Sequence, residues 1–270
     1  MIEVTWLIEE GVFPENESRL CEEIKKRGHR HILTKKPHHE EGLEYGPTIF
    51  YGSLGMATRL RRERNFVGNW CDLAKFRCSS YYCYFGDSLL NADYALVPAG
   101  DFARQRENLM RKQFGLYHKF KMFIRPDSAF KVFTGDVITP EQTLKHFLVN
   151  SILFHDDLIL VSSPKKIDSE YRFIICNGEI AGASFYSYEI NGTRYSNNQE
   201  IPDRVVNFVK KHLDYEPEIC YTIDVCETGG KLKIVELNCF SCSGFYEADL
   251  SRIVELSSEA AIKSYRDIYC

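Results

Sequence analysis

The sequence lacks the features that would assign it to several broad classes of protein. No apolar run approaches the roughly 18–20 residues that a membrane-spanning helix needs, so we expect no membrane partner. The first residues, MIEVTWLIEEG, carry acids around a short apolar run, whereas a signal peptide begins with basic residues and has a longer apolar core. We therefore expect a cytoplasmic protein whose chain begins with a strand.

The chain also lacks internal repeats, low-complexity tracts and a strong excess of one charge. Its 34 basic and 38 acidic residues leave a net charge of −4, which provides no general attraction to nucleic acid or to an anionic membrane. Hydrophobic residues make up 44% of the 270 residues and charged residues 27%, which is ordinary for a globular protein. This length allows one large domain or two modest ones.

Cysteine, in contrast, is abundant, with ten in the chain. Several stand inside apolar runs, such as Cys176 and Cys220, where a free thiol serves as a small core residue. Cys239 and Cys242 form a CxxC pair, but a zinc site would need two further ligands. Cys220 and Cys226 are the nearest in sequence and have an unusual spacing, so we interpret the CxxC pair as structural or incidental.

The first third of the chain alternates strands and helices. Residues 2–8 and 30–34 have the pattern of strands, and between them residues 14–29 have the pattern of a helix that stops at Gly28. Further strands are expected at 47–53 and 92–100. Strand, helix and strand at this spacing predict a parallel sheet with crossover helices.

Beyond residue 101 the pattern changes to helices and antiparallel strands. Helices are expected at 102–115, 139–152, 199–214 and 248–266, and strands at 121–128, 131–138 and 157–164. Asn177-Gly178 predicts the turn of a hairpin over residues 170–190. A second hairpin is expected over 218–238, with its turn at residues 228–230.

The second hairpin carries three oxygen-bearing side chains. Glu236 and Asn238 are two apart and so share one face of a strand. If the loop has three residues, Asp224 lies opposite Glu236 on the same face, whereas a two-residue turn at Gly229-Gly230 would spoil this alignment. Two carboxylates and an amide suit Mg²⁺, which shares its remaining positions with substrate phosphates. The alternative is that all three are polar residues on the solvated face of a hairpin.

Cations in two other segments favour the metal interpretation. Arg125 and Lys131 stand on or near adjacent strands, and Lys165, Lys166 and Arg172 follow the strand at 157–164. A site for a triphosphate and its metal needs such cations, because the phosphate charge must be neutralised from several sides.

Three motifs in order resemble the ATP-grasp family over residues 118–246, and most closely its phage- and bacteria-associated clade with one Arg and two Lys in the nucleotide site, the RimK-like ligases. The motifs are FIRPDSAFKVFTG, SSPKKIDSEYRFIICNGEIAGASFY and YTIDVCETGGKLKIVELNCFSCSGFY. The resemblance implies an α/β (α+β) protein with a Rossmann-like pre-ATP-grasp domain at residues 1–100. It further implies a two-lobed ATP-grasp domain at 101–270, with a small lobe at about 101–163 and a large lobe at about 164–270.

The resemblance also implies roles for individual residues. ATP and Mg²⁺ would be bound, with phosphate contacts from Arg125, Lys131 and either Lys165 or Lys166, of which we favour Lys165. Backbone groups at Val161, Ser162 and Ser163 would meet the adenine, and the serines stand where many relatives have an acid. The further roles are ribose contacts for Glu170, catalysis by Arg172 together with Arg125, and metal binding for Asp224, Glu236 and Asn238.

By this resemblance we expect an ATP- and Mg²⁺-dependent carboxylate–amine ligase that forms an amide or peptide bond through an acylphosphate. Its substrate would be an amino acid, a peptide or a protein end. The alternative is a nucleotide-binding module without ligase activity, in a regulatory or nucleic-acid-associated role. Basic stretches at 58–65 and 104–112 are interleaved with acids, as on solvated helix faces, and do not favour a nucleic-acid partner. The sequence predicts neither the two substrates nor an oligomeric state.

Overall fold

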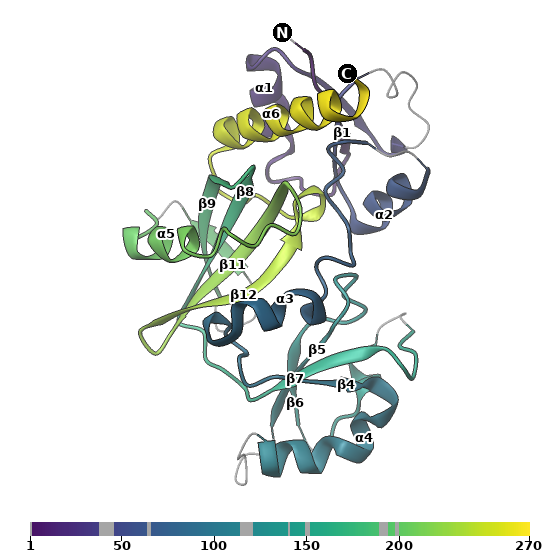
Figure 1. The fold of residues 1–270 in the computed structure, drawn as a ribbon, viewed down its shortest axis with the longest axis vertical. Coiled ribbons are helices and arrows are strands. Elements are labelled where there is room, and N and C mark those ends of the chain that lie inside the picture. The colour runs from purple at the N-terminus through teal and green to yellow at the C-terminus, as the bar shows by residue number, and fades with distance from the viewer. Residues whose placement is uncertain are drawn as a thin grey trace. The chain divides into compact units, whose positions relative to one another are not determined.

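The computed structural model describes most of the chain as two compact units (Figure 1). The described residues are 2–37, 46–63, 66–113, 121–139, 141–148, 152–188, 194–197 and 200–270. Unit 1 comprises Met1–Asp72, Ser169–Cys226 and Glu236–Cys270, and unit 2 comprises Leu73–Asp168 and Glu227–Val235. Within the described ranges, no helix is both long enough and apolar enough to cross a membrane.

Unit 1 contains a small parallel sheet built by the first residues of the chain. Its strands have the order β2-β1-β3, and both pairings are parallel. The elements of this part are β1 (Thr5–Glu9), α1 (Glu17–Lys26), β2 (Arg30–Thr34), β3 (Thr48–Tyr51) and α2 (Leu54–Glu63). Gly28 follows α1 with φ of 74°, a left-handed conformation that ends a helix at little cost in glycine. The predicted strand–helix–strand order and the parallel sheet are confirmed, whereas the Rossmann-like character of this part stays a prediction.

The larger sheet of unit 1 holds the two predicted hairpins. Its order is β10-β9-β8-β11-β12. The elements are β8 (Ser169–Cys176), β9 (Glu179–Tyr188), β10 (Arg194–Asn197), α5 (Asp203–Lys210), β11 (Cys220–Thr228), β12 (Lys231–Cys239), a 3₁₀ turn (Phe240–Cys242) and α6 (Leu250–Tyr269). Asn177 and Gly178 both have positive φ, as the tight hairpin turn requires, so the turn predicted there is confirmed.

One continuous apolar core joins the small parallel sheet to the C-terminal part of unit 1. The Trp6 side chain is buried in it and donates a hydrogen bond from Nε1 to Ser258 Oγ of α6 at 3.3 Å. Phe240 packs at its centre, 5.2 Å from Trp70 between ring centroids. Figure 1 shows α6 lying alongside α1. The core therefore unites residues that are more than two hundred positions apart.

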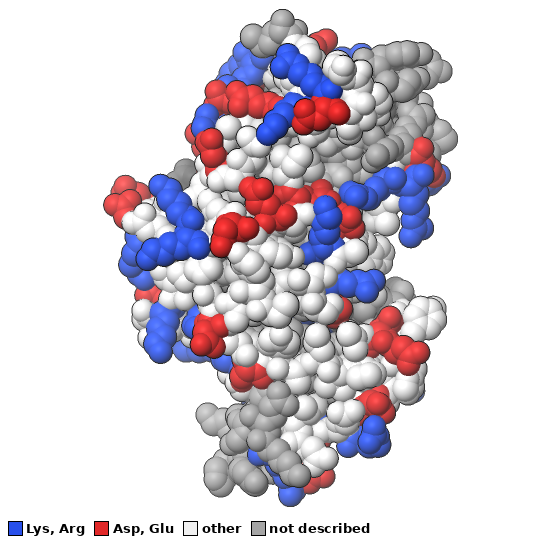
Figure 2. Space-filling view, viewed as in Figure 1, with Lys and Arg blue, Asp and Glu red and all other residues white. Residues whose placement is uncertain are grey.

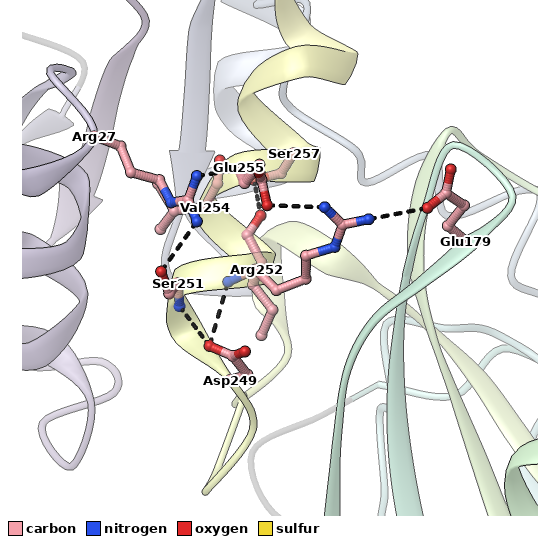
Figure 3. A network of polar contacts seen from close by, with 9 residues as sticks. Arg27, Glu179, Asp249, Ser251, Arg252, Val254, Glu255 and Ser257 are labelled. Carbon is pink, nitrogen blue, oxygen red and sulfur yellow. Dashed lines mark hydrogen bonds and ion pairs between the residues drawn. The ribbon is translucent and has the colours of Figure 1, made fainter.

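Polar contacts fix α6 at the edge of this core (Figure 3). Asp249 caps the helix by accepting hydrogen bonds from the backbone of Ser251 and Arg252. The Arg252 guanidinium binds Glu255 on the same helix and Glu179 at the start of β9. Arg27, just after α1, binds Glu255 at 3.2 Å. The first turns of α6 are thereby connected to both α1 and the β8–β9 hairpin.

Unit 2 is built around an antiparallel sheet of order β4-β7-β5-β6. Its elements are α3 (Cys78–Phe85), a 3₁₀ turn (Gly86–Ser88), β4 (Ala95–Pro98), α4 (Ala99–Asn108), a π-helical turn (Leu109–Gln113), β5 (Met122–Pro126), β6 (Asp136–Ile138), a 3₁₀ turn (Leu144–His146) and β7 (Leu158–Ser162). Side chains of α4 such as Phe102 pack with the strands in a separate apolar core. The predicted domain boundaries at residues 100 and 163 stay predictions.

The helix predicted at 139–152 is wrong for the residues that the structure describes there, which are 139, 141–148 and 152. They contain one 3₁₀ turn, Leu144–His146. The Gln142 side chain does bond back to the Thr139 amide, as a capping box requires. However, the Arg106 guanidinium donates to the carbonyl oxygens of Thr139 and Gln142. These carbonyls would otherwise accept the first bonds of a helix, so a tertiary contact overrides the local signal.

The strand predicted at 131–138 is also shorter than expected. It spans only Asp136–Ile138, and Lys131 precedes it in a loop with φ of 51°. The Lys131 amide donates to the Ser128 carbonyl at 3.2 Å, which closes a tight turn after β5. The expected tight connection between the two strands is thus present, but it includes Lys131.

Candidate functional site

The three predicted metal ligands meet in unit 1, on β11 and β12. The Asn238 amide Nδ2 lies 3.2 Å from Asp224 Oδ2 and 3.0 Å from Glu236 Oε1. Asp224 is fully buried, whereas Glu236 and Asn238 are partly exposed. The side chains therefore form one cluster with a buried floor and a side open to solvent.

The turn of this hairpin differs from the one on which that prediction depended. It has two residues, Gly229 and Gly230, with φ of 53° and 75°. A two-residue turn was expected to spoil the alignment of Asp224 with Glu236 and Asn238. That expectation was wrong, because side chains that exchange hydrogen bonds at about 3 Å lie on the same side of the sheet.

Arg172 joins the cluster from the neighbouring strand β8. Its Nε lies 2.8 Å from Asp224 Oδ1 and its Nη2 lies 2.7 Å from Asp224 Oδ2, a two-bond contact in a buried setting. Nη1 donates to the Gly244 carbonyl at 3.3 Å, and the Tyr246 ring lies 5.1 Å from the guanidinium carbon. Arg172 is thus held in place on several sides, next to the candidate metal ligands.

Glu170 lies two residues before Arg172 on the same strand. Its side chain is buried, with 2% of its surface exposed. Residues two apart on a strand point to the same side, so Glu170 and Arg172 share a face of β8. This is the arrangement that the predicted roles require within unit 1.

The other predicted nucleotide residues belong to unit 2. Val161 and Ser162 are the last buried residues of β7, where Val161 pairs with both β4 and β5. Lys165 Nζ folds back onto Ser163, contacting its carbonyl oxygen at 2.8 Å and its Oγ at 2.6 Å. Lys166, in contrast, is exposed and pairs with Asp168 at 2.8 Å. Of the two lysines, only Lys165 lies against the segment that was expected to meet adenine.

Asp93, which precedes β4, is a charged residue of this segment that the sequence reasoning missed. Its Oδ2 accepts hydrogen bonds from the Ser163 amide and hydroxyl, and its Oδ1 lies 2.7 Å from Lys165 Nζ. Burial alone would raise the pKa of Asp93, but the bonds from Lys165 and Ser163 outweigh it and lower this pKa. An acid absent from positions 162 and 163 is therefore supplied from residue 93. No local sequence signal could identify it, since the contact spans 70 residues.

Arg125 and Lys131 lie in the same unit. Arg125 is buried on β5 and pairs with Leu160 of β7. Two residues later, Asp127 caps α3 from outside that helix, accepting bonds from the Ser79 amide at 2.7 Å and hydroxyl at 2.9 Å. Asp127 was not assigned from the sequence. This cap fixes the end of the strand that carries Arg125.

The acidic cluster of unit 1 fits a hard cation by its chemistry. Asp224 and Glu236 offer carboxylate oxygens and Asn238 an amide oxygen, the donor types that Mg²⁺ takes. Arg172 offsets one of the two negative charges, so these four side chains retain a net charge of −1. In the described ranges, no group of three or more His, Cys, Asp or Glu side chains is suited to hold a metal ion. A cation here would therefore depend on further oxygens, as Mg²⁺ does when it shares phosphates with a protein.

The fold formed by these elements is that of the ATP-grasp proteins. D-alanine–D-alanine ligase from Bacillus anthracis aligns with a TM-score of 0.63 and 11% identity, over 98% of this chain and 99% of that one. The ATP-grasp ligase PsnB, solved with a minimal precursor, aligns with a TM-score of 0.61 and 10% identity, over 96% and 99% of the two chains. A RimK domain protein from Sphaerobacter thermophilus aligns with a TM-score of 0.53 and 12% identity, over 97% and 98%.

The particular family follows from the sequence. The model of an ATP-grasp domain family, the second family of the clade named for one Arg and two Lys, matches residues 106–256. This match covers more than half of the chain, so the protein belongs to this family. The resemblance drawn from the three motifs is thereby confirmed. Among curated protein sequences none matches significantly.

Proposed function

We propose that this protein is an ATP- and Mg²⁺-dependent ligase that joins a carboxylate to an amine through an acylphosphate. The observation that carries the proposal is the contact of Asp224, Glu236 and Asn238 beside Arg172 in a member of the ATP-grasp family. The substrate carboxylate would belong to an amino acid, a peptide or a protein end. Solved proteins of this fold include D-alanine–D-alanine ligase and PsnB with its precursor, which supports an activity of this class. A cytoplasmic location remains part of the proposal.

The proposed reaction has two steps. First, an oxygen of the substrate carboxylate attacks the γ-phosphorus of ATP, and the bond to ADP breaks. The amine then attacks the carbonyl carbon of the acylphosphate; phosphate leaves and the amine loses a proton. Neither step needs a protein nucleophile, because positioning and charge neutralisation lower the barrier.

The residues of the chain would supply that neutralisation from both units. In unit 1, Asp224, Glu236 and Asn238 would hold Mg²⁺, which offsets phosphate charge when bound. Arg172 would orient Asp224 and place a positive charge next to it. Glu170 would accept hydrogen bonds from the ribose hydroxyls.

In unit 2, the cationic side chains would bind phosphate and the end of β7 would bind adenine. Arg125, Lys131 and Lys165 would contact the phosphates, and backbone groups at residues 161–163 would meet the base. The close contact of Lys165 with Ser163 favours Lys165 over the exposed Lys166 for this role.

A single assay tests the proposal. The purified protein is incubated with ATP, Mg²⁺ and pools of amino acids and short peptides, and ADP and phosphate are measured with and without each pool. Release of ADP that depends on a pool supports the ligase, and the coupled product is then identified by mass. ATP binding by calorimetry without turnover in any pool would favour the nucleotide-binding module. No ATP binding in the presence of Mg²⁺ would contradict both.

A nucleic-acid-associated role receives no support from the surface. On the face shown in Figure 2, Lys and Arg are interspersed with Asp and Glu rather than gathered in a patch. Arg59 pairs with Glu63, and Arg61 with Asp72 and Glu218, so the basic stretch at 58–63 is largely neutralised by neighbours. Binding through phosphate contacts needs a concentration of positive charge that these pairs remove.

A further inference from the structure

Three thiols meet in unit 1 directly after the candidate metal ligands. Cys239 ends β12, Cys242 ends the following 3₁₀ turn, and Cys71 approaches them from the N-terminal part of the unit. The Cys242 thiol donates a hydrogen bond to Cys71 Sγ at 3.4 Å. This contact links positions 171 residues apart, so it is a feature of the folded chain alone.

The three thiols differ in exposure. Cys71 is 1% exposed and Cys239 5%, whereas Cys242 is half-buried. A small solute can therefore reach Cys242 but neither of the other two directly. The backbone holds Cys242 in place, because the Ser241 carbonyl accepts a bond from the Gly52 amide at 2.8 Å.

The cluster also favours one negative charge. Hydrogen bonds from the Cys239 and Cys242 thiols lower the pKa of Cys71 below its ordinary value, against the effect of burial, and the nearby Arg61 adds to this. Deprotonation is what makes a thiol nucleophilic. Because Cys71 and Cys242 share a hydrogen bond, a proton can move along it and place the thiolate on Cys242, the sulfur nearer to solvent.

We propose that Cys71 and Cys242 form a reversible oxidation site, at which hydrogen peroxide converts the two thiols into a disulfide. The Cys242 thiolate attacks one peroxide oxygen; an S–O bond forms, the O–O bond breaks, and the departing hydroxide takes up a proton to become water. The Cys71 thiol then loses its proton and attacks the Cys242 sulfur; the S–S bond forms and a second water leaves. Overall, two thiols and one peroxide give one disulfide and two waters.

The geometry leaves a short path to the product. The two sulfur atoms must approach from 3.4 Å to a bond length of about 2.05 Å, which side-chain rotation can accomplish. Cys239 is the neighbouring thiol that remains reduced. The proposal does not depend on ATP or on ligase activity, so it can fail or succeed independently of the proposed function.

The chain contains an internal control for this reaction. Cys176 and Cys220 form a second pair in which the two thiols are hydrogen-bonded, and both are fully buried. Burial raises the pKa of the Cys220 thiol, which keeps it protonated and unreactive. Peroxide should therefore leave the Cys176–Cys220 pair reduced while Cys71 and Cys242 are oxidised.

The experiment uses the full-length folded protein. The protein is reduced, freed of reductant and exposed briefly to hydrogen peroxide; remaining thiols are then blocked with N-ethylmaleimide in denaturant. Trypsin releases Cys71 on peptide 65–75 and both Cys239 and Cys242 on peptide 234–252. Non-reducing mass spectrometry should detect these two peptides joined, and dithiothreitol should separate them. The peptides that contain Cys176 and Cys220 should carry the blocking group.

Substitutions then identify the paired sulfurs. Cys242→Ser should abolish the joined peptide, whereas Cys239→Ser and the control Cys83→Ser, which changes an exposed cysteine in unit 2, should retain it. The proposal is overturned if the wild-type peptides are not joined or if Cys239 and Cys242 pair within peptide 234–252. It is equally overturned if the joined peptide persists in Cys242→Ser or if the Cys176–Cys220 pair is oxidised to the same extent.

Discussion

Arg172 and Asp224 form a buried ion pair with two short hydrogen bonds, 2.8 and 2.7 Å long, between the strands β8 and β11. Their side chains are only 7% and 1% exposed. A charge in such a setting is stabilised mainly by its partner, because water does not reach it. The pair therefore contributes to the fold as well as to the candidate site.

We expect Arg172→Met to lower the free energy of unfolding by about 3–5 kcal/mol, because it leaves the Asp224 charge buried and unpaired. Asp224→Asn should cost a similar amount. The double variant should cost less than the sum of the two, since it removes both charges. Urea unfolding followed by circular dichroism measures these values. If both single variants stay within about 0.5 kcal/mol of wild type, the pair has no stabilising role.

Glu236→Gln tests the metal site without disturbing that pair. Glu236 is partly exposed, and glutamine keeps its shape and its ability to accept from Asn238, so stability should change by less than about 1 kcal/mol. Mg²⁺-dependent ATP binding, measured by calorimetry, should weaken at least about tenfold. Glu247→Gln, which changes a surface acid paired with Arg19, is the matched control and should bind as wild type does. Equal binding by both variants would remove Glu236 from the proposed metal site.

Lys165 and Lys166 form a natural pair for testing the phosphate contacts. Lys165→Met should weaken ATP binding about tenfold or more, as expected for the loss of a charged hydrogen bond worth about 1.5–3 kcal/mol. Lys166→Met removes an exposed charge and should leave the affinity within about twofold. Titration of both variants with ATP and Mg²⁺ gives the comparison. A larger loss for Lys166→Met would reverse the assignment.

Asp93 should make stability depend on pH in acid. Its pKa is lower in the folded chain than the ordinary value of 3.8, so the unfolded chain takes up this proton first as pH falls. The contribution of Asp93 is thus present above pH 3.8 and is lost as pH falls through its folded pKa. The unfolding midpoint of the wild type should consequently fall more steeply below about pH 4 than that of Asp93→Asn. Parallel acid slopes for the two proteins would contradict this assignment.

The cap of α6 gives a prediction about stability alone. Asp249 Oδ1 accepts bonds from the Ser251 and Arg252 amides at 3.0 and 3.3 Å. Asp249→Ala should therefore lower the free energy of unfolding by about 1 kcal/mol, while Asp249→Asn, which can still accept these bonds, should cost much less. Thermal unfolding of the three proteins provides the measurement. A loss that is equal in both variants would indicate that the charge, rather than the hydrogen bonds, is what matters.

Local patterns were sufficient for the elements whose signals lie within a few residues. Asn177-Gly178 favours positive φ at both positions, so the turn of the β8–β9 hairpin could be placed without any tertiary information. Asp224, Glu236 and Asn238 could be proposed as a set for a similar reason, because residue alternation along a strand determines which side chains share a face. The ordered motifs then indicated the family.

Tertiary structure decided the contacts between residues far apart in the chain. Arg106 takes the carbonyls of Thr139 and Gln142 and so prevents a helix that the local capping signals favour. Asp93 reaches Ser163, and Cys71 reaches Cys242, only after strands and loops have packed. Such contacts depend on where apolar burial brings the backbone, and no spacing within the sequence encodes that position. The amino-acid order thus determined the hairpins and their acidic set, and the packed core determined which cation, acid and thiol lie next to them.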